Sequence, residues 1–230
     1  MSPAAISPKA AHLKALVFDA YGTLYDVASV GALCEQFFPG HGKAITDLWR
    51  VKQLEYTWLC SLMGRYMDFW NLTARGLRFA CGALGQKLAE DVFRQLMENY
   101  LQLAPYPEVP EALARLAKRM PLAILSNGNP EMLLRVTRHN QFSGHFKAVL
   151  SVHDLGVFKP APQVYELAEN ALELPRHQIG FVSANGWDAA GAKAFGLNVF
   201  WINRFHRPPE TLDLDPDWEI HSLAEIEPLL

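Results

Sequence analysis

Short apolar runs alternate along the chain with segments in which apolar residues recur every three or four positions. The runs are nearly continuous, which is typical of parallel strands buried on both faces of a sheet. The strands that this pattern predicts are residues 15–18, 122–125, 179–182 and 198–202, with weaker candidates at 148–150 and 218–220.

Helical periodicity fills the intervals between these runs. Residues 109–119, 162–172 and 187–195 carry apolar side chains at helical spacing, and Gly196 follows the last of them as an expected C-cap. Strands that alternate with helices predict an α/β fold, with a Rossmann-like parallel sheet joined by helical crossovers.

One long stretch departs from this alternation directly after the first predicted strand. Residues 28–103 contain no strand pattern, and helical patterns such as residues 45–63 run through them. We therefore expect two domains: a Rossmann-like core formed by residues 1–27 and 104–230, and an inserted helical cap formed by residues 28–103.

Polar side chains stand where several predicted strands end. Asp19 follows the first strand, Ser126 and Asn127 follow another, and Ser183 ends a third. Ligands of open α/β sheets bind at the carboxyl ends of the strands. A cap that emerges just after Asp19 would lie over these ends, so we expect a small-molecule pocket between the two domains.

Composition and charge exclude some classes of partner. The formal net charge is −3 and there is no strongly basic stripe, so we expect no nucleic-acid partner. No apolar run approaches membrane-spanning length and no signal peptide is visible, so we expect no membrane association. Three cysteines fit no metal-binding spacing and are interpreted as reduced thiols of a cytoplasmic protein.

Four motifs stand in a fixed order along the core segments. They are Asp19-x-x-Gly-Thr-Leu, Ser126-Asn-Gly, Lys159-Pro and Asn185-x-x-Asp188. Asp19 alone is also compatible with a residue that caps a turn. In this combination and order, however, the motifs resemble the haloacid dehalogenase superfamily over nearly the whole chain. The resemblance implies covalent catalysis by Asp19, a Rossmann-like core and a mobile cap.

The chain departs from the magnesium-dependent phosphatases of that superfamily at two places. Tyr21 stands where they have a second aspartate, and only Asp188 is acidic where they have an acidic pair. Tyrosine, with a pKa of about 10, is a poor acid for a leaving alkoxide. Both departures match the L-2-haloacid dehalogenases (type II), and residues 48–63 resemble their cap helix.

The dehalogenase resemblance implies metal-independent hydrolysis without a cofactor. Short L-2-haloalkanoic acids would become D-2-hydroxyalkanoic acids plus halide, through an ester on Asp19 with inversion at C2. Halide leaves without a proton, so the reaction needs a nucleophile but no acid. Arg50 and Asn127 would hold the halide. For Arg50 the alternative is a surface pair with Asp47, one helical turn earlier.

The resemblance also implies roles for the remaining polar residues. Ser126 and Asn127 would bind the substrate carboxylate, unless they serve only as turn and helix-cap residues. Lys159, otherwise a surface lysine, would orient Asp19 and keep it ionised. Asp188, otherwise a first-turn residue facing the helix dipole, would activate the hydrolytic water. Thr23, Tyr165, Ser183 and Asn185 would complete the catalytic set.

A group of larger side chains is expected around the substrate. Tyr21, Leu54, Phe69 and Trp187 would line an apolar pocket, although aromatic residues are more often simply part of the core. Two residues depart from relatives: Ala184 stands where many have a serine, and Val51 stands where some have a glutamine. The sequence does not indicate the preferred halogen, the chain length or the physiological substrate.

Two other functions remain open at this point. One is a magnesium-dependent phosphatase acting on a small substrate, and the other is a non-catalytic carboxylate-binding scaffold on the same fold. The resemblance further implies a homodimer with cap helices at its interface. Halide release with a chelator present separates these alternatives.

Overall fold

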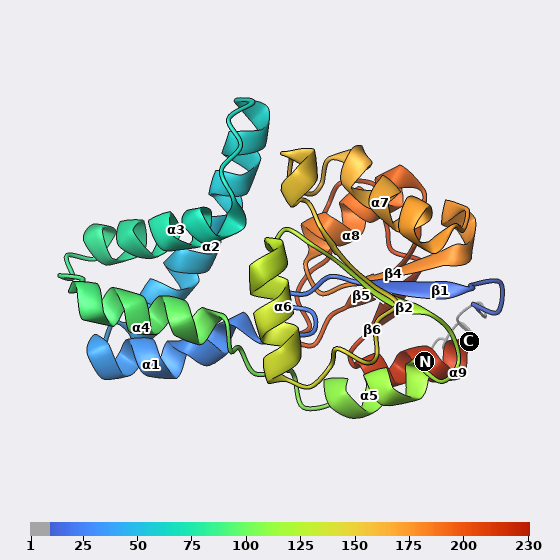
Figure 1. Cartoon of the computed structure of the whole chain (residues 1–230), viewed down its shortest axis with the longest axis horizontal. Coiled ribbons are helices and arrows are strands. Elements are labelled where there is room, and N and C mark those ends of the chain that lie inside the picture. The colour runs from blue at the N-terminus through green and yellow to red at the C-terminus, as the bar shows by residue number, and fades with distance from the viewer. Residues whose placement is uncertain (1–9) are drawn as a thin grey trace.

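A parallel sheet of six strands forms the centre of the molecule (Figure 1). The computed structural model describes residues 10–230. The strand order is β3-β2-β1-β4-β5-β6, and every neighbouring pair is parallel. The strands are β1 (Ala15–Phe18), β2 (Leu122–Ser126), β3 (Ala148–Ser151), β4 (Ile179–Ser183), β5 (Asn198–Ile202) and β6 (Trp218–Ile220).

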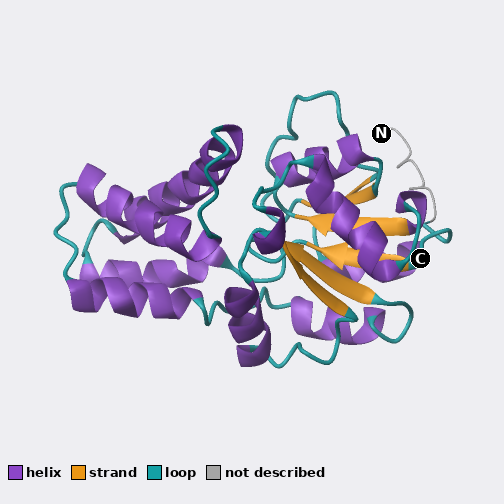
Figure 2. Ribbon diagram, turned by 45° about the horizontal axis from the view of Figure 1, so that its top comes forward, coloured by secondary structure: helices purple, strands orange, loops and turns teal. Residues whose placement is uncertain are grey.

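The central strands are apolar because both faces of the sheet are covered. Every residue of β1, β2 and β4 is buried, as their continuous apolar runs predict. Helices α7 and α8 lie on one side of the sheet and α5 and α9 on the other (Figures 1 and 2). The helices of this region are α5 (Val109–Leu116), α6 (Pro130–His139), α7 (Pro162–Leu172), α8 (Gly186–Phe195) and α9 (Ile226–Leu229).

The segment between β1 and α5 is helical, and its helices stand to one side of the sheet (Figures 1 and 2). Helices α2 and α3 make its most extensive internal contact. The four helices are α1 (Gly31–Phe37), α2 (Gly42–Leu62), α3 (Phe69–Ala83) and α4 (Glu90–Tyr100). Short 3-10 turns occur at Val27–Val30, His153–Leu155, Arg176–Gln178 and Leu223–Glu225.

The chain crosses between the helical lobe and the sheet at two adjacent segments. The backbone N–H of Asp26 donates to the carbonyl of Ala104 at 2.8 Å, and the N–H of Tyr106 donates to that of Leu24 at 3.1 Å. Tyr25 and Pro105 also form an antiparallel bridge. This pairing supports the proposed division of the chain into a core domain of residues 1–27 and 104–230 and a cap domain of residues 28–103.

The α/β fold expected from the sequence is confirmed, and all six predicted strands are present. One helix end differs from the prediction. The helix expected over residues 109–119 ends at Leu116, and Lys118 and Arg119 lie in the following turn. Gly196 does cap α8, with a φ of 98° in the left-handed region.

None of the helices formed by residues 10–230 has both the length and the apolar character needed to cross a membrane.

Candidate active site

The candidate site lies at the carboxyl edge of the sheet, where the strand order reverses. Strand β1 has β2 on one side and β4 on the other. Asp19, the first residue after β1, therefore lies beside the ends of two strands that the chain reaches much later. Loops at such a reversal open away from each other and leave a crevice for ligands.

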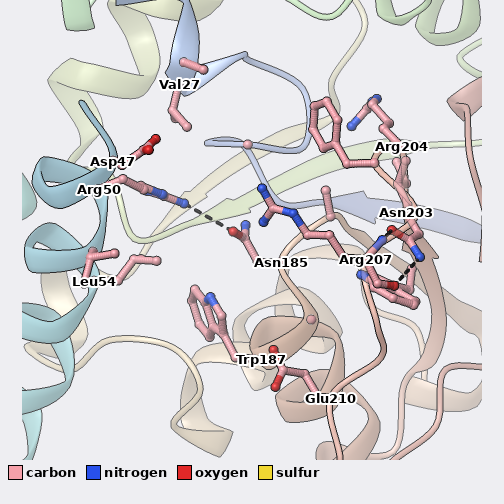
Figure 3. Close-up of a pocket in the computed structure, with 18 of the residues that line it drawn as sticks. Val27, Asp47, Arg50, Leu54, Asn185, Trp187, Asn203, Arg204, Arg207 and Glu210 are labelled. Atoms are coloured by element: carbon pink, nitrogen blue, oxygen red, sulfur yellow. Dashed lines mark hydrogen bonds between the residues drawn. The ribbon is translucent and has the colours of Figure 1, made fainter. Parts of the chain in front are cut away.

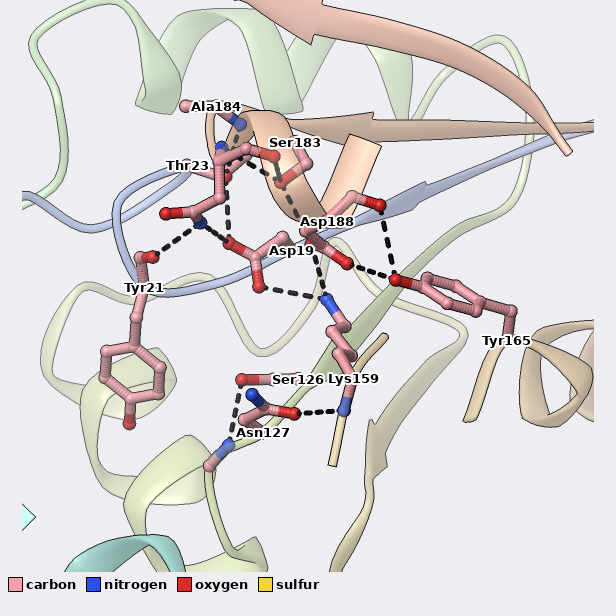
Figure 4. A network of polar contacts seen from close by, with 12 residues as sticks. Asp19, Tyr21, Thr23, Ser126, Asn127, Lys159, Tyr165, Ser183, Ala184 and Asp188 are labelled. Carbon is pink, nitrogen blue, oxygen red and sulfur yellow. Dashed lines mark hydrogen bonds and ion pairs between the residues drawn. The ribbon is translucent and has the colours of Figure 1, made fainter. Parts of the chain in front are cut away.

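The carboxylate of Asp19 is almost completely buried and is held by three donors (Figure 4). Its Oδ1 accepts from Lys159 Nζ at 3.0 Å. Its Oδ2 accepts from Thr23 Oγ1 at 3.0 Å and from Asn185 Nδ2 at 2.9 Å. Partners of this kind compensate the cost of burying a charge and fix the orientation of the carboxylate.

Lys159 is buried between two carboxylates and is not a surface lysine. Its Nζ lies 3.0 Å from Asp19 Oδ1 and 2.9 Å from Asp188 Oδ2, with 1% of the side chain exposed. Burial lowers the pKa of this ammonium, but the charges and hydrogen bonds of both carboxylates raise it more. The pKa of Lys159 therefore lies above its ordinary value, and the group is a fixed positive charge.

Asp188 lies in the first turn of α8, with no exposed surface. Its Oδ2 accepts from Lys159 and from Ser183 Oγ at 2.9 Å, and its Oδ1 accepts from Tyr165 OH at 2.8 Å. Burial raises the pKa of this carboxyl above its ordinary value, although the Lys159 ammonium opposes the shift. A carboxyl with a raised pKa is suited to accept a proton.

The loop after β4 is tied to the turn after β1 by short contacts. The backbone N–H of Ala184 donates to Thr23 Oγ1 at 2.9 Å, and that of Asn185 donates to Ser183 Oγ at 3.2 Å. Since position 184 contributes its backbone to this contact, an alanine there leaves the contact intact.

Arg50 reaches the site from α2, and its acceptors within residues 10–230 are all neutral oxygens. Nη1 donates to Gln53 Oε1 at 2.7 Å. Nη2 donates to the carbonyl of Tyr21 at 3.0 Å and to Asn185 Oδ1 at 3.3 Å. The alternative surface pair with Asp47 is not formed, because Asp47 pairs with Lys43.

Ser126 ends β2 and Asn127 follows it, and both lie beside Lys159 (Figure 4). The Ser126 hydroxyl accepts from the backbone N–H of Gly128 at 3.1 Å, while Asn129 is the residue that caps α6. Asn127 Oδ1 accepts from the backbone N–H of Lys159 at 3.0 Å. Within the described residues its amide nitrogen donates to no neighbour, which leaves this donor available for a ligand.

Aromatic rings close the site on the side of the helical lobe. Tyr21 is stacked on Tyr100 at 5.6 Å and lies 5.7 Å from Phe69, measured between ring centroids. Its hydroxyl is buried without a hydrogen-bond partner among residues 10–230. Burial raises the pKa of Tyr21 well above its ordinary value, so this side chain borders the site as an uncharged phenol.

A cleft of about 360 Å³ opens beside this network (Figure 3). Arg50, Leu54, Asn185 and Trp187 all contribute to its lining. Asn185 also donates to Asp19, so the side chain of Asn185 lies between the cleft and that carboxylate.

No group of three or more His, Cys, Asp or Glu side chains in residues 10–230 is arranged to hold a metal ion. The positive charge between Asp19 and Asp188 is instead the ammonium of Lys159.

The structure thus brings the residues selected from the sequence to one edge of the sheet, while their individual roles remain predictions. Sequence reasoning missed Gln53 and Tyr100 as parts of the site. Gln53 stands three positions after Arg50, a spacing that places both on the same face of a helix. Tyr100 closes α4, and nothing in the sequence relates it to Arg50.

Comparison with known proteins agrees with this geometry. The family model for haloacid dehalogenase-like hydrolases matches residues 13–196. The chain is 48% identical over 216 residues to an (S)-2-haloacid dehalogenase from Pseudomonas sp. (strain YL), covering 94% of this chain and 93% of that protein.

Solved structures of similar proteins extend the comparison. One L-2-haloacid dehalogenase superposes with a TM-score of 0.91 at 45% identity, covering 93% of this chain and 96% of the other. Another, from Xanthobacter autotrophicus with chloropropionic acid covalently bound, has a TM-score of 0.90 at 39% identity, covering 94% and 98%.

Proposed function

This chain belongs to the haloacid dehalogenase-like hydrolase family, and we propose that it removes the halogen from short L-2-haloalkanoic acids by hydrolysis. The products are the D-2-hydroxyalkanoic acid and the halide ion. The observation that carries the proposal is a buried Asp19 carboxylate, oriented by three donors, with the Arg50 guanidinium reaching the same site from α2.

In the first step Asp19 attacks C2 of the substrate from the side opposite the halogen. A bond forms between a carboxylate oxygen and C2, and the carbon–halogen bond breaks with its electron pair on the halide. Arg50 and the amide nitrogen of Asn127 receive the halide, since donors placed where charge develops stabilise the transition state. Attack from behind inverts the configuration at C2.

Binding of the substrate carboxylate fixes C2 in line with Asp19. Ser126 and Asn127, with backbone N–H groups after Asp19, supply the donors. Tyr21, Leu54, Phe69 and Trp187 surround the alkyl group. Holding the reacting atoms in this geometry converts the displacement into an effectively intramolecular step.

In the second step water hydrolyses the ester at the carbonyl carbon of Asp19. Asp188 takes the proton from water and returns it to the alkoxide oxygen as the tetrahedral intermediate collapses, so the hydroxy acid leaves with its new C–O bond intact. The carboxyl group of Asp19 that is regenerated in this step loses its own proton to solvent. Lys159 lies between the two carboxylates and stabilises the negative charge on the ester carbonyl oxygen. Thr23, Ser183, Asn185 and Tyr165 maintain the orientation of both carboxyl groups.

We propose that neither step needs a metal ion or a cofactor. Tyr21 stands where a phosphatase would have its acidic aspartate. Burial raises the pKa of Tyr21, so this tyrosine stays neutral. Lys159 supplies the cation beside the nucleophile. Halide leaves without protonation, so the first step proceeds without that acid, and in the second step Asp188 supplies the proton that it took from water.

The test is halide release from each enantiomer of 2-chloropropionate with excess EDTA present. We expect release from the L enantiomer alone, with D-lactate as the product, and no turnover after Asp19→Asn. The control is Asp91→Asn, an exposed carboxylate of α4, which should remain fully active. Racemic or retained product, or full activity in freshly purified Asp19→Asn, would contradict the mechanism.

We also propose that two copies of the chain associate through the helical lobe. Leu62 is 84% exposed and Met63 is 59% exposed at the end of α2. Met63 also lines, together with Leu59, a groove of about 510 Å³. An exposed apolar surface of this kind is typical of a protein interface.

A reducing, cytoplasmic location is the remaining part of the proposal. It is supported by Cys34, Cys60 and Cys81, all of which are free thiols.

A further inference from the structure

Gln53 lies behind Arg50 on α2 and is completely buried. Its Oε1 accepts from Arg50 Nη1 at 2.7 Å and from Tyr100 OH at 3.0 Å. Its Nε2 donates to Thr73 Oγ1 at 2.6 Å. Both ends of the amide are therefore engaged, and the side chain has one orientation.

The partner of Gln53 on α3 is fixed in turn. Thr73 Oγ1 donates to the carbonyl of Phe69 at 2.7 Å, and the Thr73 carbonyl accepts from Trp49 Nε1 at 2.7 Å. The network joins α2, α3 and α4, so that the position of Arg50 depends on the packing of the whole lobe.

The acceptors that hold Arg50 are all neutral oxygens. Elsewhere in the described part of the chain, the partly buried Arg204 pairs with a glutamate, and so does the exposed Arg176. Arg50 instead has three oxygens without formal charge as acceptors, and no carboxylate among residues 10–230 pairs with it. A carboxylate anchor would hold the guanidinium as well but would cancel much of its charge.

We propose that Gln53 is the positioning residue for the halide cradle: it fixes the Arg50 guanidinium through a neutral oxygen, so that the full positive charge is available to the departing halide. The inference rests on the proposed dehalogenation. A preorganised donor that needs no reorientation during the reaction stabilises the transition state most effectively.

The test is Gln53→Glu, which keeps the shape of the side chain and places a carboxylate against Arg50. We expect kcat/KM for L-2-chloropropionate to fall by about tenfold or more. The loss should be smaller for L-2-bromopropionate, because bromide is a better leaving group and depends less on stabilisation. A purely structural defect would lower both values equally and leave their ratio unchanged.

Two further variants separate charge from packing. Gln53→Met removes the acceptor without adding a charge. We expect it to lower kcat/KM for L-2-chloropropionate less than Gln53→Glu does, while the two variants have similar thermal stability. Gln102→Glu makes the same change of charge at an exposed position of the helical lobe and should leave both rates unchanged.

Bromide binding, followed by line broadening of ⁸¹Br in NMR at constant ionic strength, requires no turnover. We expect the wild-type protein to bind bromide and Gln53→Glu to bind it at least about fivefold more weakly. If the wild-type protein binds bromide more tightly than Gln53→Glu but releases no halide from either substrate, the proposed function fails, while the positioning of Arg50 by Gln53 stands. The role of Gln53 would be overturned if the wild-type protein bound no bromide. It would also be overturned if Gln53→Glu left unchanged either bromide binding or the ratio of kcat/KM for L-2-bromopropionate to that for L-2-chloropropionate.

Discussion

At the scale of single residues, the site depends on two buried carboxylates that share one ammonium. Asp19 and Asp188 have nearly the same distance to Lys159 Nζ, but their other partners differ. Asp19 accepts from Asn185, which also lines the cleft, whereas Asp188 accepts from Tyr165 in the interior. This asymmetry supports a nucleophile at Asp19 and a base at Asp188.

The contact between Tyr165 and Asp188 leads to a prediction about pH. Tyr165→Phe removes a hydrogen bond that favours the carboxylate, so the pKa of Asp188, already raised by burial, should rise further. Since Asp188 must be ionised to take a proton from water, the acidic limb of the kcat profile should move to higher pH. We expect kcat at neutral pH to fall roughly tenfold.

The measurement is a pH profile of kcat together with mass spectrometry of the quenched enzyme. The variant should accumulate the ester on Asp19, because the second step is slowed. The control is Tyr56→Phe, which removes a hydroxyl from α2 outside this network. An unshifted acidic limb without accumulation of the ester would exclude Asp188 as the base.

At the scale of secondary-structure elements, the strands were the most predictable part of the molecule. Strands β1, β2 and β4 are buried on both faces, so their sequences are apolar without interruption. The end of α5 was less predictable, because Lys118 and Arg119 favour a helix C-terminus but lie in the next turn. Local preference does not define the last turn of a helix.

The environment of Arg50 shows the limit of sequence reasoning at this scale. Spacing on α2 allows contact with Asp47 or with Gln53, each three positions away. Only the packing of α2 against α3 and α4 decides between them, because it buries Gln53 and leaves Asp47 exposed. The motif resemblance predicted the role of Arg50, but it did not predict the partner that fixes it.

The close approach of α2 and α3 leads to a prediction about stability. A methyl group at Gly76 would lie 3.1 Å from Trp49 Cδ1 and 3.2 Å from the backbone nitrogen of Gln53. Gly76→Ala should therefore cost about 1–3 kcal/mol of unfolding free energy, because α2 must shift. It should also lower kcat, since Arg50 moves with α2.

A matched control exists on the same helix. A methyl group at Gly82 meets nothing within 4 Å, so Gly82→Ala should stabilise the protein by about 0.4–1 kcal/mol without affecting activity. Urea unfolding and steady-state kinetics of both variants are the measurements. Equal stability and activity in the two variants would show that helix contact at Gly76 does not position α2.

At the scale of the whole molecule, the active site is assembled from two lobes that the chain joins at one place. Asp19, Lys159 and Asp188 come from the sheet lobe, whereas Arg50 comes from the helical lobe. The contact of Ser61 Oγ with the backbone N–H of Phe158 at 3.1 Å is another link between them. The domain boundaries, residues 1–27 and 104–230 against residues 28–103, remain a prediction.

The exposed end of α2 leads to the last prediction. Dimerisation through this surface would cover Leu62 and Met63 and would hold α2, and with it Arg50, in place. Leu62→Arg introduces a charge into the apolar surface, which a partner copy could bury only at high cost. We expect the wild-type protein to sediment as a dimer and Leu62→Arg as a monomer at micromolar concentration. Leu212→Arg, at another exposed leucine, should remain dimeric. Sedimentation velocity separates these outcomes, and a dimer that survives Leu62→Arg would place the interface on a different surface.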